Sequence, residues 1–381
     1  MAIVPVPLPR VTPDRTWAVG RPLIGCRFDP TGRFLFASTE DNSIRRLDLL
    51  TGAVVSFAEH ASWVRGMVFI AHGPSAVAET VACERRQAAV RAAGGPMAVS
   101  VPTPKPSPLT AVTGDYHGKL IWWNAAEPKP TKIRTVDAHN GWIRAVAVSP
   151  DGQSIASCGN DHLVKLWSAS SGQLIRTFTG HASHVYNVVF HPNGKQLASC
   201  DLKGIVKVWD ISNGANARQL DAAVLYKYDP GFMADIGGAR GMAFDSAGRL
   251  ACCGITNVSN AFAGVGNPIV VAFDAKDGKP KLFKPVEAFQ GTAWGVAFHP
   301  AGFVVAAGGG SGGRIWLWSG NEPLLTRSVN VPANARDLAL HPAGDRLVVA
   351  GGNGTAYLYS LRSPTRDIVT SAVVTAKRKT S

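Results

Sequence analysis

One sequence pattern occurs twice in tandem near the middle of the chain, and no other feature restricts the possible fold as strongly. The copies cover residues 139–167 and 180–210, and their turn glycines, Gly152 and Gly194, are 42 residues apart. In each copy, short runs rich in Val, Ile and Ala alternate with turns of Pro, Gly, Asn and Asp. This alternation predicts short antiparallel strands. A period of about 40 to 45 residues with four strands per unit predicts a blade of a β-propeller.

Five weaker copies of the pattern extend the series to seven. In each copy a short apolar segment precedes the turn, and these segments span residues 24–28, 63–69, 142–148, 184–190, 240–244, 294–298 and 336–340. Seven repeats close a ring, so the predicted fold is all-β, a seven-bladed propeller of four-stranded antiparallel blades over residues 15–362. Residues 1–14 are predicted to be an N-terminal extension, and residues 363–381 a basic C-terminal tail.

The second repeat contains a long insertion. The turn glycines Gly32 and Gly152 are 120 residues apart, which exceeds two repeats of 42 by 36 residues and places the insertion at about residues 72–108. Its first half, residues 76–93, is rich in Ala, Glu and Arg and predicts a short helix. Its second half, residues 94–108, holds five prolines and predicts an extended linker. We expect the propeller to fold without the insertion.

The repeats resemble those of the WD-repeat β-propeller family from about Thr16 to Tyr359. In that family a His, a Ser or Thr, an Asp and a Trp from one repeat form a hydrogen-bonded structural set. The resemblance assigns this role to His139, Ser157, Asp161 and Trp167 in the third repeat, and to His181, Ser199 and Trp209 in the fourth. In the fourth repeat, Lys203 stands where the Asp is expected.

The resemblance leaves two candidates for the strand that completes the last blade. In the family this strand normally comes from the N-terminus, which here would be residues 10–19. Residues 366–375 could instead follow the last repeat as an ordinary fourth strand. We favour the N-terminal segment.

Composition restricts the cell compartment and the possible partners. No apolar run approaches the roughly 18 residues of a membrane helix, and the six cysteines fall mostly on apolar strands, as buried thiols do in a reducing compartment. We therefore expect a cytoplasmic protein with no membrane association. The net charge of +13 favours anionic partners, including nucleic acid, without identifying one.

Motifs for catalysis and cofactor binding do not fit the predicted strands. The segment Gly308–Gly313 matches a nucleophile-elbow pattern and a dinucleotide-binding pattern, but both require a following helix. A strand, residues 314–318, follows instead. His191, His299 and His341 occupy one equivalent position in different blades, too far apart for a metal site. We therefore expect no enzyme activity, no cofactor and no metal.

One column of the aligned repeats indicates a binding surface. In a propeller this column lies at the mouth of the channel on the top face, and its members are Ile24, Arg65, Arg144, Tyr186, Arg240, Trp294 and Arg336. Trp63 and Trp142 lie two residues earlier in their repeats. Arginine is rarely buried without a partner, and converging guanidinium groups bind carboxylates or phosphates. The alternative is that each arginine caps nearby carbonyls or pairs with a local acid such as Asp337 or Asp235.

The predicted function is that of a non-catalytic scaffold that binds an acidic or phosphorylated protein segment at this mouth. Two extra segments of the fifth repeat, residues 226–238 and 255–268, are expected to form a wall beside it, with Phe232, Met233, Phe262 and Val265 as its apolar part. The alternative is that the two segments merely pack on each other. Two alternatives stay open. One is association with nucleic acid through the positive charge, and the other is an enzyme with its active site at the channel mouth.

Overall fold

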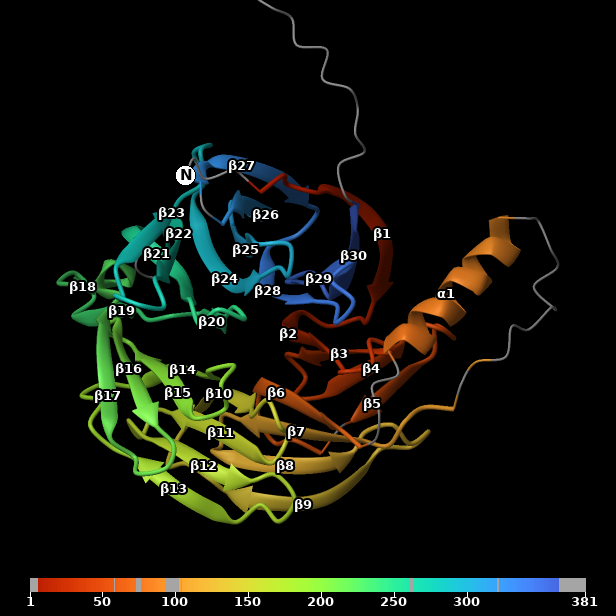
Figure 1. Cartoon of the computed structure of the whole chain (residues 1–381), viewed down its shortest axis with the longest axis horizontal. Coiled ribbons are helices and arrows are strands. Elements are labelled where there is room, and N and C mark those ends of the chain that lie inside the picture. Colours follow the sequence, from red (N-terminus) through yellow and green to blue (C-terminus); the bar gives the residue numbers. More distant parts are fainter. Residues whose placement is uncertain are drawn as a thin grey trace, which may run out of the picture.

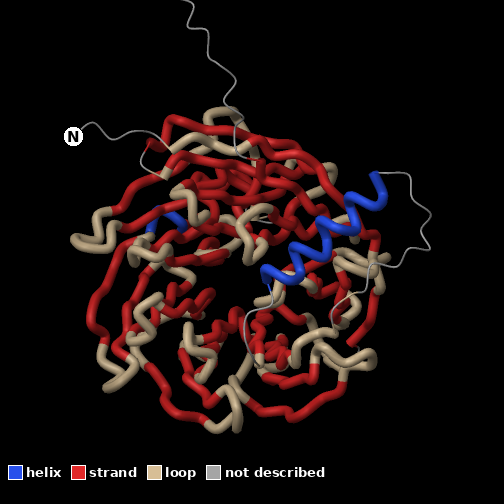
Figure 2. The backbone as a smooth tube through the Cα atoms, turned by 45° about the vertical axis from the view of Figure 1, so that its right-hand side comes forward, coloured by secondary structure: helices blue, strands red, loops and turns tan. Residues whose placement is uncertain are grey.

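The computed structural model describes residues 6–57, 59–72, 77–92, 103, 105–260, 264–320 and 322–362. It shows seven four-stranded antiparallel blades arranged in a ring around a central channel (Figure 1). Strands dominate the fold, and the described part of the chain contains one α-helix, α1 (Val77–Ala92), visible on the flank of the ring in Figure 2. The predicted all-β, seven-bladed architecture is confirmed.

Consecutive strands build each blade from the channel outwards. Blades 1 and 2 contain β2 (Leu23–Phe28), β3 (Phe34–Thr39), β4 (Ile44–Asp48), β5 (Val54–Phe57), and β6 (Val64–Ala71), β7 (Leu109–Asp115), β8 (Lys119–Asn124), β9 (Thr131–Asp137). Blades 3 and 4 contain β10 (Ile143–Val148), β11 (Ser154–Gly159), β12 (Val164–Ser168), β13 (Leu174–Phe178), and β14 (Val185–Phe190), β15 (Gln196–Asp201), β16 (Ile205–Asp210), β17 (Asn216–Asp221).

The last three blades follow the same plan, and several of their strands are longer. Blades 5 and 6 contain β20 (Gly241–Phe244), β21 (Leu250–Asn260), β22 (Val265–Phe273), β23 (Pro280–Phe283), and β24 (Gly291–Phe298), β25 (Phe303–Gly310), β26 (Gly312–Ser319), β27 (Glu322–Val331). Blade 7 contains β28 (Ala335–Leu340), β29 (Arg346–Gly351), β30 (Thr355–Arg362) and, as its outer strand, β1 (Arg10–Ala18). Between blades 4 and 5 lie η1 (Ala223–Leu225) and a hairpin of β18 (Tyr226–Asp229) and β19 (Ala234–Gly237).

The turn glycines recur because the backbone requires them. Gly152 and Gly194 follow the innermost strands of blades 3 and 4 and have φ angles of 71° and 68°. Residues with a side chain rarely adopt this left-handed conformation, whereas glycine does so at little cost. The 42-residue spacing of these glycines therefore records one turn geometry used again in successive blades.

The hydrophobic core consists of seven clusters, and each cluster joins two neighbouring blades. One cluster packs Trp122 of blade 2 against Trp167 of blade 3. The ring closes with a cluster that packs Leu23 of blade 1 against Val348 of blade 7. Because every blade contributes apolar side chains to both of its neighbours, removing one blade exposes two core clusters to water.

The N-terminal segment completes the last blade. Strand β1 pairs antiparallel with β30, from Arg10 opposite Arg362 to Ala18 opposite Thr355, with one register shift after Pro13. The favoured alternative for ring closure is thereby confirmed. The boundary expected at residue 15 is wrong, because residues 10–14 belong to this strand. The competing segment, residues 366–375, and the basic tail lie outside the described residues.

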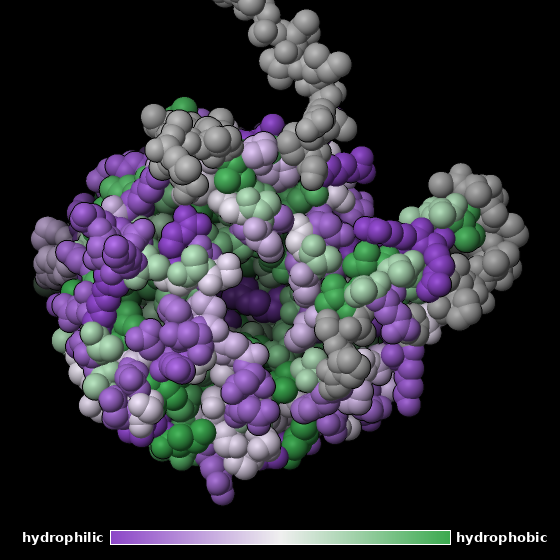
Figure 3. Space-filling model, in the orientation of Figure 1, coloured by the Kyte–Doolittle hydropathy of each residue, from purple (hydrophilic) through white to green (hydrophobic). Residues whose placement is uncertain are grey.

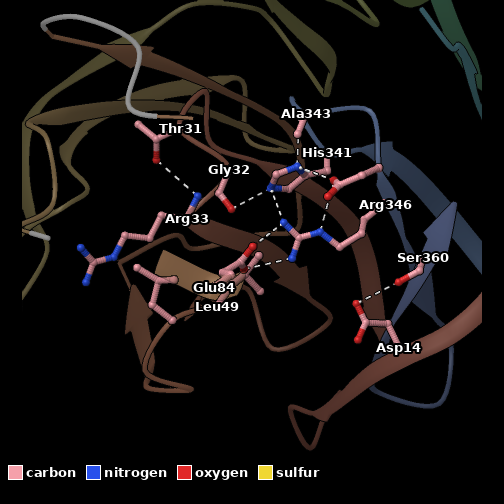
Figure 4. A network of polar contacts seen from close by, with 12 residues as sticks. Asp14, Thr31, Gly32, Arg33, Leu49, Glu84, His341, Ala343, Arg346 and Ser360 are labelled. Carbon is pink, nitrogen blue, oxygen red and sulfur yellow. Dashed lines mark hydrogen bonds and ion pairs between the residues drawn. The ribbon is translucent and has the colours of Figure 1, made fainter. Parts of the chain in front are cut away.

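We call the face where the innermost strands begin the top and the face where they end the bottom. Helix α1 is the predicted helix of the blade 2 insertion, and it docks on the bottom face rather than standing apart from it. Glu84 of α1 forms two hydrogen bonds, of 3.0 and 2.7 Å, to the guanidinium of Arg346 in blade 7 (Figure 4). His341 Nε2 lies 3.0 Å from the same guanidinium, and Cys83 of α1 is fully buried. The insertion thus connects blade 2 to blade 7.

Two expectations from composition concern thiols and membranes. All six cysteines are buried and carry free thiols, in agreement with their assignment as packing residues. Burial raises the pKa of the Cys200 thiol to about 12, which keeps it protonated near neutral pH. In the described ranges, no helix combines the length and apolar character that crossing a membrane requires.

Candidate functional site

The innermost strands share a β-bulge near their first residue. In six blades the pairing between the first and second strands skips one residue, which leaves that residue unpaired. A bulge bends the strand and changes the direction of its side chain. The residues at these bulges are Ile24, Arg65, Arg144, Tyr186, Trp294 and Arg336. In blade 5, Arg240 directly precedes β20 and donates its N–H to Cys253 O (2.8 Å).

The column found in the sequence is therefore a repeated structural position, and its side chains meet. All seven line one cavity of about 560 Å³ at the top mouth of the channel. Figure 3 views the ring along its axis from the face that carries α1 and shows the channel opening, with hydrophilic residues in its depth. The remaining lining residues are Glu40, Trp63, Tyr116, Val265, Gly310 and Asn334.

Cations and aromatic rings alternate around this cavity. The Arg144 guanidinium lies 4.4 Å from the ring centre of Tyr186, and the Arg240 guanidinium lies 4.9 Å from the same ring. Trp294 separates Arg240 from Arg65, at 5.1 and 5.6 Å. Cation–π contact of this kind stabilises a guanidinium by about 0.5 to 2 kcal/mol. The rings hold three arginines in place without neutralising them.

Two of the four arginines satisfy the alternative interpretation, in which each arginine has a structural partner. Arg336 forms an ion pair with Glu40. Arg65 donates to the backbone oxygen of Ile24 (2.6 Å). Asp337 and Asp235, the acids named in that alternative, do not pair with these arginines. Asp337 pairs with Arg27, and Asp235 accepts a hydrogen bond from Tyr226 (2.7 Å).

The other two arginines lack an acidic partner. Arg144 donates its Nε–H to the side chain of Asn160 (2.8 Å), and the Nε of Arg240 is buried without a hydrogen-bond partner. Neither guanidinium has a carboxylate within 4.0 Å among the residues that the structure describes. Burial lowers the pKa of Arg240, and the positive charges of Arg144 and Arg65 lower it further. The site thus holds positive charge that the protein itself leaves uncompensated.

Aromatic side chains form the rim of the cavity above blades 2 and 3. Tyr116 stacks on Trp142 with ring centres 4.3 Å apart, and Trp63 packs against the same tyrosine at 6.1 Å. Both tryptophans are 43% exposed. Sequence reasoning missed Tyr116 and Glu40. Both lie in turns between the second and third strands of their blades. These turns open on the top face, so a search of the turn sequences would have found both residues.

Only one of the two extra segments of the fifth repeat reaches the cavity. The β21–β22 hairpin places Val265 in the lining and contacts blade 6, where Thr292 donates to Gly264 O (2.7 Å). The β18–β19 hairpin lies at the edge of the ring in Figure 1, away from the central opening. Its residues Phe232 and Met233 are 56% and 81% exposed. The two segments contact each other, where Lys227 Nζ donates to Val258 O (3.2 Å). Only the second segment lines the cavity, so the expected wall of both segments beside the channel mouth is wrong. Phe262 lies outside the described residues.

The structural residues assigned by resemblance are hydrogen bonded to one another. In blade 3, His139 Nδ1 lies 2.8 Å from Asp161 and its Nε2 lies 2.7 Å from Ser157, which also accepts from Trp167 Nε1 (2.8 Å). In blade 4, Ser199 lies 2.7 Å from both His181 Nε2 and Trp209 Nε1.

The expectation that blade 4 lacks the acid because of Lys203 is wrong. Asp201 lies two residues earlier and contacts His181 Nδ1 at 3.0 Å. Blade 2 has a third complete set, in which Asp115 contacts His60 Nδ1 (2.9 Å) and Thr113 contacts Nε2 (2.8 Å). The acid can therefore come from the end of the second strand or from the turn after it.

The motifs resembling catalytic sites have structural explanations. The glycine-rich segment is a hairpin between β25 and β26 with Ser311 at its tip. His299 and His341 contact the backbone oxygens of Gly344 and Gly32 in the following blades, at 2.5 and 3.0 Å. Among the described residues, no group of three or more His, Cys, Asp or Glu side chains is placed to hold a metal ion.

Comparison with known proteins shows that two repeats of this chain match a known family of repeats. The family model "WD domain, G-beta repeat" matches residues 130–168 and 172–210, which correspond to blades 3 and 4. The small ribosomal subunit protein RACK1y of Oryza sativa subsp. japonica is 38% identical over 74 residues, 19% of this chain and 21% of that protein. The nuclear distribution protein PAC1 of Coccidioides posadasii is 28% identical over 142 residues, 37% of this chain and 26% of that protein.

Shorter matches agree with this assignment. WD repeat domain-containing protein 83 of Danio rerio is 48% identical over 42 residues, 11% of this chain and 13% of that protein. The chain thus spans about a quarter or less of the length of each of these relatives. The family model thus identifies blades 3 and 4 as WD repeats, and the other five blades follow the same strand plan.

Proposed function

We propose that this protein is a non-catalytic scaffold that binds an acidic or phosphorylated segment of another protein at the top mouth of its channel. The observation that carries the proposal is the placement of Arg144 and Arg240 in one cavity without a carboxylate partner. Arginine binds carboxylates and phosphates through two parallel hydrogen bonds. An anionic side chain entering the cavity would supply the charge that these two residues lack.

The aromatic rim supports a protein partner. Trp63, Tyr116 and Trp142 are rigid, so ordering them on binding costs little entropy. Tryptophan, tyrosine and arginine are also the residue types that contribute most binding energy at protein interfaces. A peptide that places its acidic group near Arg144 would pack its neighbouring residues on this rim. A cytoplasmic location stays a prediction.

Exchanging the charge of the site tests the proposal. We expect Arg144→Glu with Arg240→Glu to abolish binding of a fluorescent phosphoserine-containing acidic peptide measured by anisotropy. The matched control is Arg10→Glu with Arg362→Glu, which makes the same change of charge at an exposed pair on the outer edge of blade 7. Unchanged peptide binding by a folded cavity variant would overturn the proposal.

The same variants separate a protein partner from nucleic acid. Nucleic-acid binding through the net charge of +13 is sequence-independent and weakens steeply with salt. It would respond about equally to the cavity and control exchanges. Binding of a single-stranded oligonucleotide that depends on Arg144 and Arg240, with no peptide binding, would favour the nucleic-acid alternative.

A further inference from the structure

A second cavity lies in the channel directly beneath the first. It has a volume of about 410 Å³ and is lined by the innermost strands. Arg65, Arg144 and Arg240 line both cavities. Their guanidinium groups therefore form a layer across the channel, and a ligand in this layer would contact residues from three blades at once.

The two acids that line the second cavity, Asp29 and Asp337, already have hydrogen-bond or ion-pair partners within the protein. Asp337 pairs with Arg27 and accepts hydrogen bonds from the backbone N–H groups of Cys26 (3.1 Å) and Leu338 (2.9 Å). Asp29 accepts from Thr31 N (3.1 Å) and Phe34 N (2.7 Å). Neither carboxylate forms an ion pair with the arginine layer in the described part of the chain. The layer keeps three positive charges in a confined space, where charges interact more strongly than in open water.

The aromatic rings leave the arginine donors accessible. Tyr186 and Trp294 contact the guanidinium groups through the faces of their rings, and a guanidinium carries its N–H donors in its own plane. Arg65 uses Nη1 on the backbone oxygens of Ile24 (2.6 Å) and Arg336 (3.5 Å), Arg144 uses Nε on Asn160, and the Nε of Arg240 is buried. Each guanidinium has five donors. The layer therefore keeps donors for a ligand on the channel axis, although the Nε of Arg240 is not among them.

Charge and size define the ligand. One carboxylate would leave two of the three positive charges uncompensated, whereas two or three adjacent phosphate groups would neutralise all of them. Cavities of about 300 to 1,000 Å³ hold small molecules, so the 410 Å³ below the layer admits a compact ligand. We propose that the arginine layer binds a small polyanion with adjacent phosphate groups on the channel axis. Because this ligand uses Arg144 and Arg240, it competes with the partner segment proposed above and regulates its access.

Calorimetry on the full chain tests this proposal. Sodium phosphate, pyrophosphate and tripolyphosphate are titrated separately, and myo-inositol hexakisphosphate distinguishes a phosphate ester from inorganic polyphosphate. We expect one saturable site and a gain in affinity of about tenfold for each added phosphate, corresponding to about 1.4 kcal/mol per step. Arg144→Gln with Arg240→Gln is expected to weaken tripolyphosphate binding by about 30-fold or more. Should this double variant fail to fold, Arg144→Gln alone is expected to weaken it by about tenfold.

Two further variants separate this proposal from the proposed function. Trp63→Ala removes one ring of the rim that does not contact the arginine layer, whereas Trp142 lies 4.6 Å from the Arg144 guanidinium and is left in place. This variant should weaken peptide binding and leave tripolyphosphate binding within about threefold. Arg10→Gln with Arg362→Gln should change neither. Several weak sites, or equal affinity in the wild type and the arginine variants, would overturn the polyanion site while leaving the peptide site intact. Binding of tripolyphosphate without binding of any acidic peptide would overturn the proposed function alone.

Discussion

Arginines on the two faces of the ring have opposite surroundings. On the bottom face, Arg346 is 10% exposed and contacts Glu84, Asp345 and His341. On the top face, Arg240 is held between two aromatic rings and has no carboxylate nearby in the described part of the chain. A buried arginine needs its matched acids, because removing one of them leaves an uncompensated buried charge. A confined arginine without them keeps its binding capacity for a ligand, so the partners of an arginine distinguish a structural role from a binding role.

The largest expected effect is on the bottom face. Glu84→Ala leaves the buried Arg346 without its bidentate partner, and we expect a loss of about 3 kcal/mol in the free energy of unfolding. Urea denaturation measures this loss. Glu79→Ala, at an exposed position of the same helix, is the matched control and should change stability by less than about 0.5 kcal/mol.

Replacing both Glu84 and Arg346 tests whether the loss of stability comes from the unpaired charge. Glu84→Leu with Arg346→Met removes both charges together, and apolar replacement of a buried ion pair is often close to neutral. We expect the double variant to be more stable than Glu84→Ala. A double variant as unstable as the single one would show that the loss does not come from the unpaired charge of Arg346.

The hydrogen-bonded sets should show the next largest effect. Asp201→Ala removes the acceptor of His181 and of the backbone N–H groups of Lys203 and Ile205, which lie 3.0 Å away. Stranding buried donors costs about 1 to 3 kcal/mol. The Asp201 side chain is 3% exposed and that of Asp161 is 11% exposed, so Asp201→Ala should cost more than Asp161→Ala in chemical denaturation. Lys203→Ala should cost less than about 0.5 kcal/mol, and a larger loss would contradict this assignment.

Acid should weaken the same sets. Burial raises the pKa of the Asp161 carboxyl, but hydrogen bonds from His139 and from backbone N–H groups outweigh it and keep this pKa below its usual value. The unfolded chain therefore binds the proton more readily. The stability from Asp161 is complete above the unfolded pKa of about 3.9 and is lost as pH falls through the lower folded pKa.

His139 adds to this acid sensitivity. Burial lowers the pKa of its imidazole more than the hydrogen bond that it donates to Asp161 raises it. Its contribution therefore declines as pH falls below about 6.5, the unfolded value. Urea midpoints measured from pH 7 to pH 3 should decrease, with a smaller decrease below pH 5 in Asp161→Asn. Identical slopes in the wild type and this variant would contradict the assignment.

The smallest expected effect on stability is on the top face. Arg240→Gln removes two cation–π contacts but also relieves repulsion from Arg144 and Arg65, so we expect a change of less than about 1 kcal/mol. Its effect on peptide affinity should be far larger, about 30-fold. Thermal denaturation and anisotropy on one sample compare the two. A loss of stability equal to that of Glu84→Ala would make Arg240 a structural residue and remove the contrast between the faces.

Features that repeat could be predicted from the sequence. The 42-residue spacing is set by one turn geometry and one pattern of core contacts, so Gly152 and Gly194 identified the blades. The same alignment found the column from Ile24 to Arg336, because one strand position bulges in blade after blade. Helix α1 was also predicted, since its composition differs from that of the surrounding strands.

Features that depend on a contact between distant segments could not be predicted. Glu40 and Arg336 are 296 residues apart, and Glu84 and Arg346 are 262 apart, so no local pattern relates them. Asp201 was missed for another reason. Its carboxylate reaches His181 from a position two residues earlier than the Asp161 pattern suggests, and only the geometry of the blade shows that the two positions are equivalent.

The pairing of β1 with β30 determines when the ring can form during synthesis. Ribosomes release a chain from its N-terminus, so residues 10–18 emerge long before residues 355–362, their only partner strand in this blade. Throughout translation β1 is an unpaired edge, the kind of strand that aggregates with other chains. Pro13 and the charged residues Arg10, Asp14 and Arg15 oppose such pairing. A chain that stops before blade 7 never closes, so an interrupted product stays recognisable to quality control by its open edge.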